Sequence, residues 1–139
     1  MEDSFSHHQK ALSAFLNILG GSHHRTGDVH VRIAGHHLRL YQFNEAMYVG
    51  LSPPNFATNE GSEHIDSALH IFGRDEWFLP ERARALFRKS AIREAMWEVA
   101  EAITCRQESL SLYAQVTGKE ASEAVTDAEF DDIVTFWSR

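Results

Sequence analysis

Apolar residues near the start of the chain recur at the spacing of an α-helix. The stripe that they form consists of Phe5, Leu12, Phe15, Leu16 and Leu19. Such spacing gives a helix one apolar face. Ser4 can cap its first turn, and Gly20-Gly21 supplies a residue for the left-handed conformation that often ends a helix. We therefore predict an amphipathic helix over residues 5–19.

Between residues 28 and 52, apolar positions alternate with polar ones. They fall into three groups: Val29, Val31 and Ile33; Leu38 and Leu40; Met47, Val49 and Leu51. A period of two is typical of strands that bury one face. Two-residue turns at Gly35-His36 and Asn44-Glu45 would join the strands, and all these apolar side chains would then share one face. The pattern predicts an antiparallel three-strand meander.

The same register places like residues opposite each other on the other face of the meander. Arg32 pairs with Arg39, and Tyr41 pairs with Tyr48. Like charges across a ladder are unfavourable unless something neutralises them. We favour solvation or an acidic side chain from another segment. The alternative is a partner that lays a carboxylate or an extended chain across this face.

The middle of the chain carries weaker signals. Residues 53–62 contain Pro, Asn and Gly and predict a loop. Residues 63–78 fit a short helix or a hairpin, and we favour the helix. Pro80 suits the first turn of a long helix over about 80–103.

Two further elements complete the chain. Alternation over residues 109–116 predicts a strand, with residues 103–105 as a candidate hairpin partner. A capping box formed by Thr126 and Glu129 then starts a closing helix. The expected fold is a single α+β domain over residues 1–139, in which helices flank an antiparallel sheet in the order α-βββ-α-β(β)-α.

Composition narrows the function classes. The net charge is −7. This disfavours binding to nucleic acid or to anionic membrane surfaces, because a protein that binds either one needs a positive electrostatic potential. No apolar run approaches the ~20 residues of a membrane span, and the first residues lack the pattern of a signal peptide. The single cysteine, Cys105, fits a reducing compartment. We expect a bacterial cytoplasmic protein.

The chemistry-bearing residues form no catalytic or metal-binding motif. Six of the nine histidines stand in adjacent pairs, a spacing that rarely gives two ligands to one metal, so we favour surface histidines and expect no metal and no cofactor. We interpret the lone cysteine as a small residue of the core and not as a nucleophile. We therefore expect no enzyme activity.

A basic run stands in the predicted long helix: Arg82, Arg84, Arg88, Lys89 and Arg93. On a helix these residues span more than one face, so we favour a solvated surface, and an anion or RNA site is the alternative. The acidic residues of the last segment could complement the run within the molecule or across a dimer.

The pattern resembles the class I chaperones of type III secretion systems. The resemblance rests on the opening residues 14–20, the predicted meander with its turn at Gly35-His36, and the last helix start at 126–130. It covers residues 5–52 and 107–138 and departs over 53–104. It implies a homodimer that binds the extended N-terminal segment of a secreted effector without a cofactor.

By that resemblance, apolar residues of the first helix and the sheet would line a client groove. The arginine and tyrosine pairs, on the other face of the meander, would offer a separate contact surface. The partner-binding residues would be Phe15, Leu16, Leu19, Val29, Val31, Arg32, Arg39, Leu40, Tyr41 and Tyr48. For any one apolar residue, ordinary core packing is the competing interpretation. The alternative function is a small acidic immunity protein or phage-encoded inhibitor that also acts by protein binding.

Overall fold

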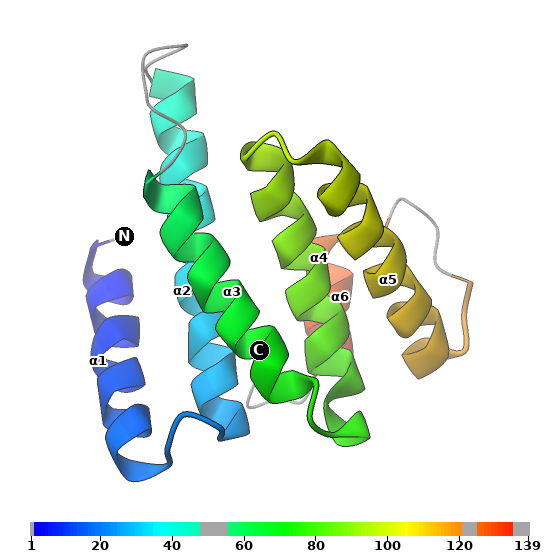
Figure 1. Cartoon of the computed structure of the whole chain (residues 1–139), viewed down its shortest axis with the longest axis horizontal. Coiled ribbons are helices and arrows are strands. Elements are labelled where there is room, and N and C mark those ends of the chain that lie inside the picture. The colour runs from blue at the N-terminus through cyan, green and yellow to red at the C-terminus, as the bar shows by residue number, and fades with distance from the viewer. Residues whose placement is uncertain (1, 48–55, 121–124, 135–139) are drawn as a thin grey trace.

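In the computed structural model every regular element of the described residues, 2–47, 56–120 and 125–134, is helical (Figure 1). The elements are α1 (Glu2–Ile18), α2 (His24–Met47), α3 (Phe56–Phe72), the 3-10 turn η1 (Glu76–Phe78), α4 (Leu79–Ala95), α5 (Val99–Thr117) and α6 (Asp127–Ile133). Successive helices from α1 to α5 pack side by side, and α6 crosses behind α4 and contacts α4 and α5.

The predicted α+β sheet is wrong, and the described part of the predicted meander is one helix. α2 runs through both Gly35-His36 and Asn44-Glu45, the residues predicted as turns. The helix lies among α1, α3 and α4, so residues on several of its sides are buried, among them Val29, Val31 and Ile33. Buried positions on several sides leave no single stripe, and an alternating subset of them imitates a strand.

Small residues allow α2 and α3 to approach closely. A Cβ at Gly27 of α2 would lie 2.8 Å from Cζ of Phe72, and one at Gly61 of α3 would lie 3.3 Å from Cβ of His37. Ala34 and Ala68 are fully buried in the core shared by α2, α3 and α4. Glycine normally weakens a helix interior, but here it makes room for the neighbouring helix.

The predicted late strand is also helical. Residues 109–116 belong to α5, and residues 103–105, its candidate hairpin partner, lie in the same helix. Ala102, Cys105 and Ser109 are buried at intervals of three and four residues. Two of these three buried residues precede residue 109. The pattern of residues 109–116 alone therefore does not reveal the helical periodicity.

The predicted helix over 80–103 is divided in two. α4 ends at Ala95, and Trp97 has φ 65°, a left-handed conformation that is uncommon for a residue other than glycine. The Arg93 guanidinium donates a hydrogen bond of 2.6 Å to the Glu98 carboxylate across this turn. No glycine or proline marks the break, which explains why the pattern did not reveal it.

Several local signals are confirmed. Gly20, with φ 84°, follows α1, and proline stands in the first turn of α4. Thr126 and Glu129 form the capping box of α6. The favoured helix within 63–78 exists, but α3 begins earlier, at Phe56, so most of the predicted loop over 53–62 is helical.

No helix among the described residues combines the length and apolar character needed to cross a membrane.

Candidate anion-binding site

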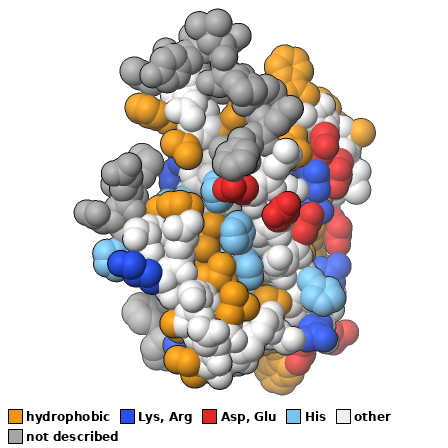
Figure 2. Space-filling view, turned by 60° about the vertical axis from the view of Figure 1, so that its left-hand side comes forward, with side chains coloured by type: hydrophobic (Ala, Val, Ile, Leu, Met, Phe, Trp, Pro, Cys, Tyr) orange, Lys and Arg blue, Asp and Glu red, His pale blue; other side chains and the backbone are white. Residues whose placement is uncertain are grey.

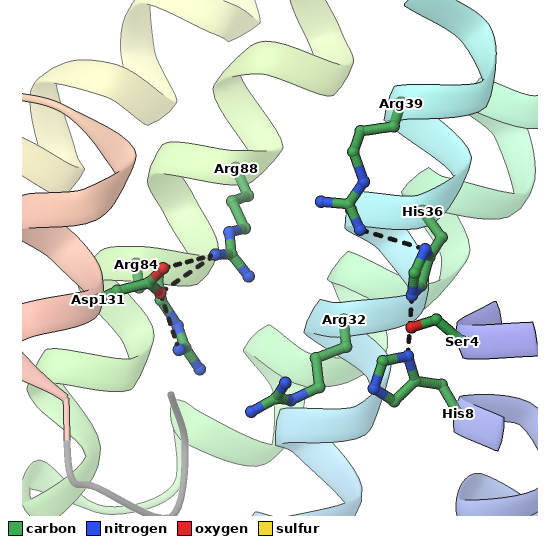
Figure 3. A pocket seen from close by; sticks show the side chains of 9 residues that line it. Ser4, His8, Arg32, His36, Arg39, Arg84, Arg88 and Asp131 are labelled. Atoms are coloured by element: carbon green, nitrogen blue, oxygen red, sulfur yellow. Dashed lines mark hydrogen bonds and ion pairs between the residues drawn. The ribbon is translucent and has the colours of Figure 1, made fainter. Parts of the chain in front are cut away.

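A cavity of about 250 Å³ lies where α1, α2, α4 and α6 meet (Figure 3). Its lining is Ser4, His8, Arg32, Gly35, His36, Arg39, Arg84, Arg88 and Asp131. Four of these residues carry a guanidinium and only one carries a carboxylate. In a chain of net charge −7, this is a local concentration of positive charge.

One face of α2 supplies the arginines on one side of this pocket. Arg32, Gly35, His36 and Arg39 follow one another at intervals of three, one and three residues, so helical geometry brings them to one face. Gly35 has no side chain, which leaves open space between the two arginines. Figure 3 shows Arg32 reaching from α2 into the space that Arg84 and Arg88 approach from α4.

The arginines on the opposite side are held by carboxylates. The Arg84 side chain is only 2% exposed, and its Nη1 lies 3.1 Å from Oδ1 of Asp131 while Nη2 lies 3.6 Å from Oδ1 of Asp28. Arg88 pairs with Asp131 and with Asp127, each at 3.1 Å. These ion pairs fix both guanidiniums before any ligand arrives.

A chain of hydrogen bonds sets the protonation of the two histidines. Nη2 of Arg39 lies 3.1 Å from Nδ1 of His36, and Nε2 of His36 lies 2.8 Å from Nδ1 of His8. A guanidinium only donates, so Nδ1 of His36 accepts and its proton resides on Nε2. His36 then donates to His8, whose own proton resides on Nε2.

The pKa values agree with neutral histidines. Burial, together with Arg39 and His8, lowers the pKa of His36 to about 4. Burial, then Arg32 and Arg39, lowers the pKa of His8. At neutral pH the pair therefore adds no charge to the pocket, and it leaves one free hydrogen-bond donor, the Nε2–H of His8.

Arg32 and Arg39 differ from Arg84 and Arg88 in their partners. Within the described residues, no carboxylate lies within ion-pair distance of Arg32 or Arg39. The only hydrogen-bond partner of Arg39 there is the neutral His36. Both cations line the cavity, and neither is paired with a carboxylate in the part of the chain that the structure describes.

A second hollow of about 150 Å³ adjoins the pocket. It shares His8 and Arg32 with the pocket, and Phe15 and Val29 add apolar surface to it. Its remaining lining residues, Arg25 and Asp28, are of opposite charge. The two hollows together offer a cationic part next to a partly apolar one.

The residues predicted to bind a partner do not form one groove. Phe15, Val29 and Arg32 meet at the second hollow, and Arg39 faces the pocket. Val31 is fully buried in the core, whereas Leu16, Leu19 and Leu40 are exposed. Tyr41 is half-buried on α2. Tyr48 lies outside the described residues, so its predicted pairing with Tyr41 has no structural counterpart here.

The basic run contributes more than a solvated surface. The prediction that acidic residues of the last segment complement it is confirmed by Asp127 and Asp131. The interval of four residues between Arg84 and Arg88 could have identified them as one face. The role of His8 and His36 left no comparable signal, since α1 and α2 meet only in the folded chain.

Other histidines also meet between helices. Nδ1 of His30 and Nδ1 of His64 lie 2.7 Å apart, and His37 lies 3.3 Å from a carboxylate oxygen of Glu60. Figure 2 shows exposed histidines among apolar side chains on one face of the molecule. His36 and His37, in contrast, are buried. The prediction of surface histidines is therefore wrong for these two.

Neither metal nor thiol chemistry is favoured by the geometry. Among the residues whose placement is described, no three or more His, Cys, Asp or Glu side chains are grouped so that they could hold a metal ion. Burial raises the pKa of the Cys105 thiol, and a protonated thiol is a poor nucleophile.

No family model matches this chain, and no curated protein or solved structure shows significant similarity to it.

Proposed function

We propose that this protein binds a small anionic ligand in the pocket between α1, α2, α4 and α6. The observation that carries the proposal is the pair Arg32 and Arg39, which face the cavity without a carboxylate partner among the described residues. Cations gathered without compensation repel one another, and an oxyanion between them would relieve that repulsion.

The chemistry of the lining suits an oxyanion. Guanidiniums bind phosphate and carboxylate groups through paired, charge-assisted hydrogen bonds. Arg84 and Arg88 are already positioned by Asp131, so little side-chain entropy is lost when a ligand meets them. A volume of about 250 Å³ suits a small molecule.

The chaperone hypothesis loses support that it had from the sequence. The resemblance to secretion chaperones used an α-βββ order, and the helix α2 occupies residues 28–47, where the first two of those strands were expected. Client binding, homodimer formation and the inhibitor role stay untested predictions, as does cytoplasmic localisation.

The test is isothermal titration calorimetry of the native chain with sulfate, inorganic phosphate and acetate at pH 7.5 and low salt. We expect binding of the tetrahedral anions, and we expect it to weaken at least tenfold in Arg32→Gln/Arg39→Gln, since each lost charge-assisted contact is worth about 1.5–3 kcal/mol. Arg74→Gln, in the exposed turn before η1, is the single-charge control and should bind as the native chain does.

Two results would contradict the proposal. One is that none of the anions binds to the native chain at millimolar concentration. The other is that the double variant, with an unchanged circular dichroism spectrum, binds as well as Arg74→Gln.

A further inference from the structure

The polar groups that face the pocket are almost all hydrogen-bond donors. Arg32, Arg39, Arg84 and Arg88 only donate. His8 presents Nε2–H because its Nδ1 is occupied by His36. The hydroxyl of Ser4 can donate as well.

The one carboxylate of the lining is already engaged. Oδ1 of Asp131 accepts from Arg84 and from Arg88, each at 3.1 Å, and Oδ2 lies 3.4 Å from Arg88. It lies at the α6 side of the pocket, away from Arg32 and His8 (Figure 3). A ligand between Arg32, Arg39 and His8 therefore meets donors and needs acceptors.

A fully ionised tetrahedral oxyanion meets that need. A dianionic phosphate has only acceptors on its three terminal oxygens, whereas its protonated form carries a hydroxyl that would itself require an acceptor. A phosphate diester offers two ionised oxygens and a single negative charge. The donor set thus favours the dianion over both.

The second hollow provides for the rest of the ligand. This hollow shares His8 and Arg32 with the pocket, so the two are adjacent. Phe15 and Val29 give it apolar surface. An organic group joined to a phosphate held at Arg32 would point toward this apolar surface. Free phosphate would leave the hollow empty.

On the basis of the proposed anion binding, we infer that the ligand is a small phosphate monoester, bound as its dianion, whose organic group packs on Phe15 and Val29. His36 is a positioning residue in this site. It receives a hydrogen bond from Arg39 and fixes His8 as a donor.

Calorimetry with phenyl phosphate, dimethyl phosphate and sulfate tests the inference. At pH 7.5 we expect phenyl phosphate to bind about tenfold tighter than sulfate, because burial of ring carbons adds to the same anion contacts. Dimethyl phosphate should bind at least tenfold more weakly than phenyl phosphate. Phe15→Ala should abolish the advantage of phenyl phosphate over sulfate and leave sulfate affinity unchanged.

The pH profile supplies a second readout. Below the second ionisation of the monoester, near pH 6, its affinity should fall about tenfold for each pH unit, while sulfate affinity stays level down to pH 5. The titratable and charged groups facing the ligand come from four helices. They are His8 of α1, Arg25, Asp28, Arg32, His36 and Arg39 of α2, Arg84 and Arg88 of α4, and Asp131 of α6; the hydroxyl of Ser4 also lines the pocket. His36→Phe removes the imidazole that fixes His8 and should reduce the preference for phenyl phosphate over dimethyl phosphate.

The outcomes separate this inference from the proposed function. If sulfate binds through Arg32 and Arg39 but phenyl phosphate gains nothing over it, or if dimethyl phosphate binds equally well, the monoester inference is overturned and anion binding stands. Phenyl phosphate affinity that does not change between pH 7.5 and 5 would also overturn it. If no anion binds, both fail.

Discussion

Two glycines of α2 should respond in opposite ways to alanine. At Gly35 a Cβ would meet only Nη1 of Arg39, at 3.8 Å, which is an ordinary contact. At Gly27 a Cβ would lie 2.8 Å from Cζ and 3.0 Å from Cε1 of Phe72. The Phe72 ring is only 1% exposed within the core, so it has little room to move aside.

The expected magnitudes follow from these contacts. Alanine is favoured over glycine in a helix interior by about 0.5–1 kcal/mol, and Gly35→Ala should raise the free energy of unfolding by that amount. At Gly27 the same gain is opposed by overpacking that costs about 1–3 kcal/mol. Gly27→Ala should therefore lower the free energy of unfolding by about 1 kcal/mol.

Urea unfolding followed by far-ultraviolet circular dichroism at pH 7.5 measures both changes. A double-mutant cycle with Phe72→Leu adds a control, since the smaller side chain makes room for the new methyl group and should give a favourable coupling of about 1 kcal/mol or more. If residues 28–52 were a meander, Gly35 would occupy a turn that requires positive φ, and alanine there would destabilise. A destabilised Gly35→Ala would thus refute the helical account of this segment.

Two further predictions concern histidine ionisation and backbone strain. Burial, with His64 beside it, lowers the pKa of His30 from 6.5 to about 4, so the unfolded chain binds more protons and the free energy of unfolding should fall as the pH drops from 6.5 towards 4. Because His30 is only partly buried, solvent screening limits the loss to about 1–2 kcal/mol. Urea titrations at pH 7.5 and 5 should show a smaller loss in His30→Gln, and an equal loss would contradict this cause. Trp97→Gly should raise the free energy of unfolding by up to about 1 kcal/mol, because glycine adopts the left-handed conformation without strain. The same urea titration measures this change, and Trp77→Gly, at another highly exposed tryptophan, is the control. A Trp97→Gly variant less stable than the native chain would contradict it.

The sequence predicted best where one local interaction determines the structure. The capping box of Thr126 and Glu129 closes within four residues, and Gly20 ends α1 by its own conformational freedom. The turn at Trp97 could not be foreseen, because an ion pair across it and the packing of α5 on α4 determine it. In the same way, Val29, Val31 and Ile33 alternate along the chain, but only the helices around α2 explain why all three are buried.

For the candidate site, too, the sequence indicates some features and only the folded structure shows the others. The sequence draws attention to Arg32 and Arg39 because the predicted register places the two like charges opposite each other, and the basic run of α4 offers an anion site as an alternative. The pocket itself joins α1, α2, α4 and α6, whose contacts span more than a hundred residues of chain. Nothing in the local pattern links His8 to His36 or Asp131 to Arg84.

The sequence by itself thus determined the ends of several helices, the charge of the chain, and the spacing that places Arg32, His36 and Arg39 on one side of a helix. Only the tertiary structure decided that residues 28–47 are helical and that their arginines face those of α4. The physical reason is that a segment buried on several sides has no unique periodicity, so its neighbours select its conformation. Those neighbours also supply the donors and the ion pairs from which the pocket is built.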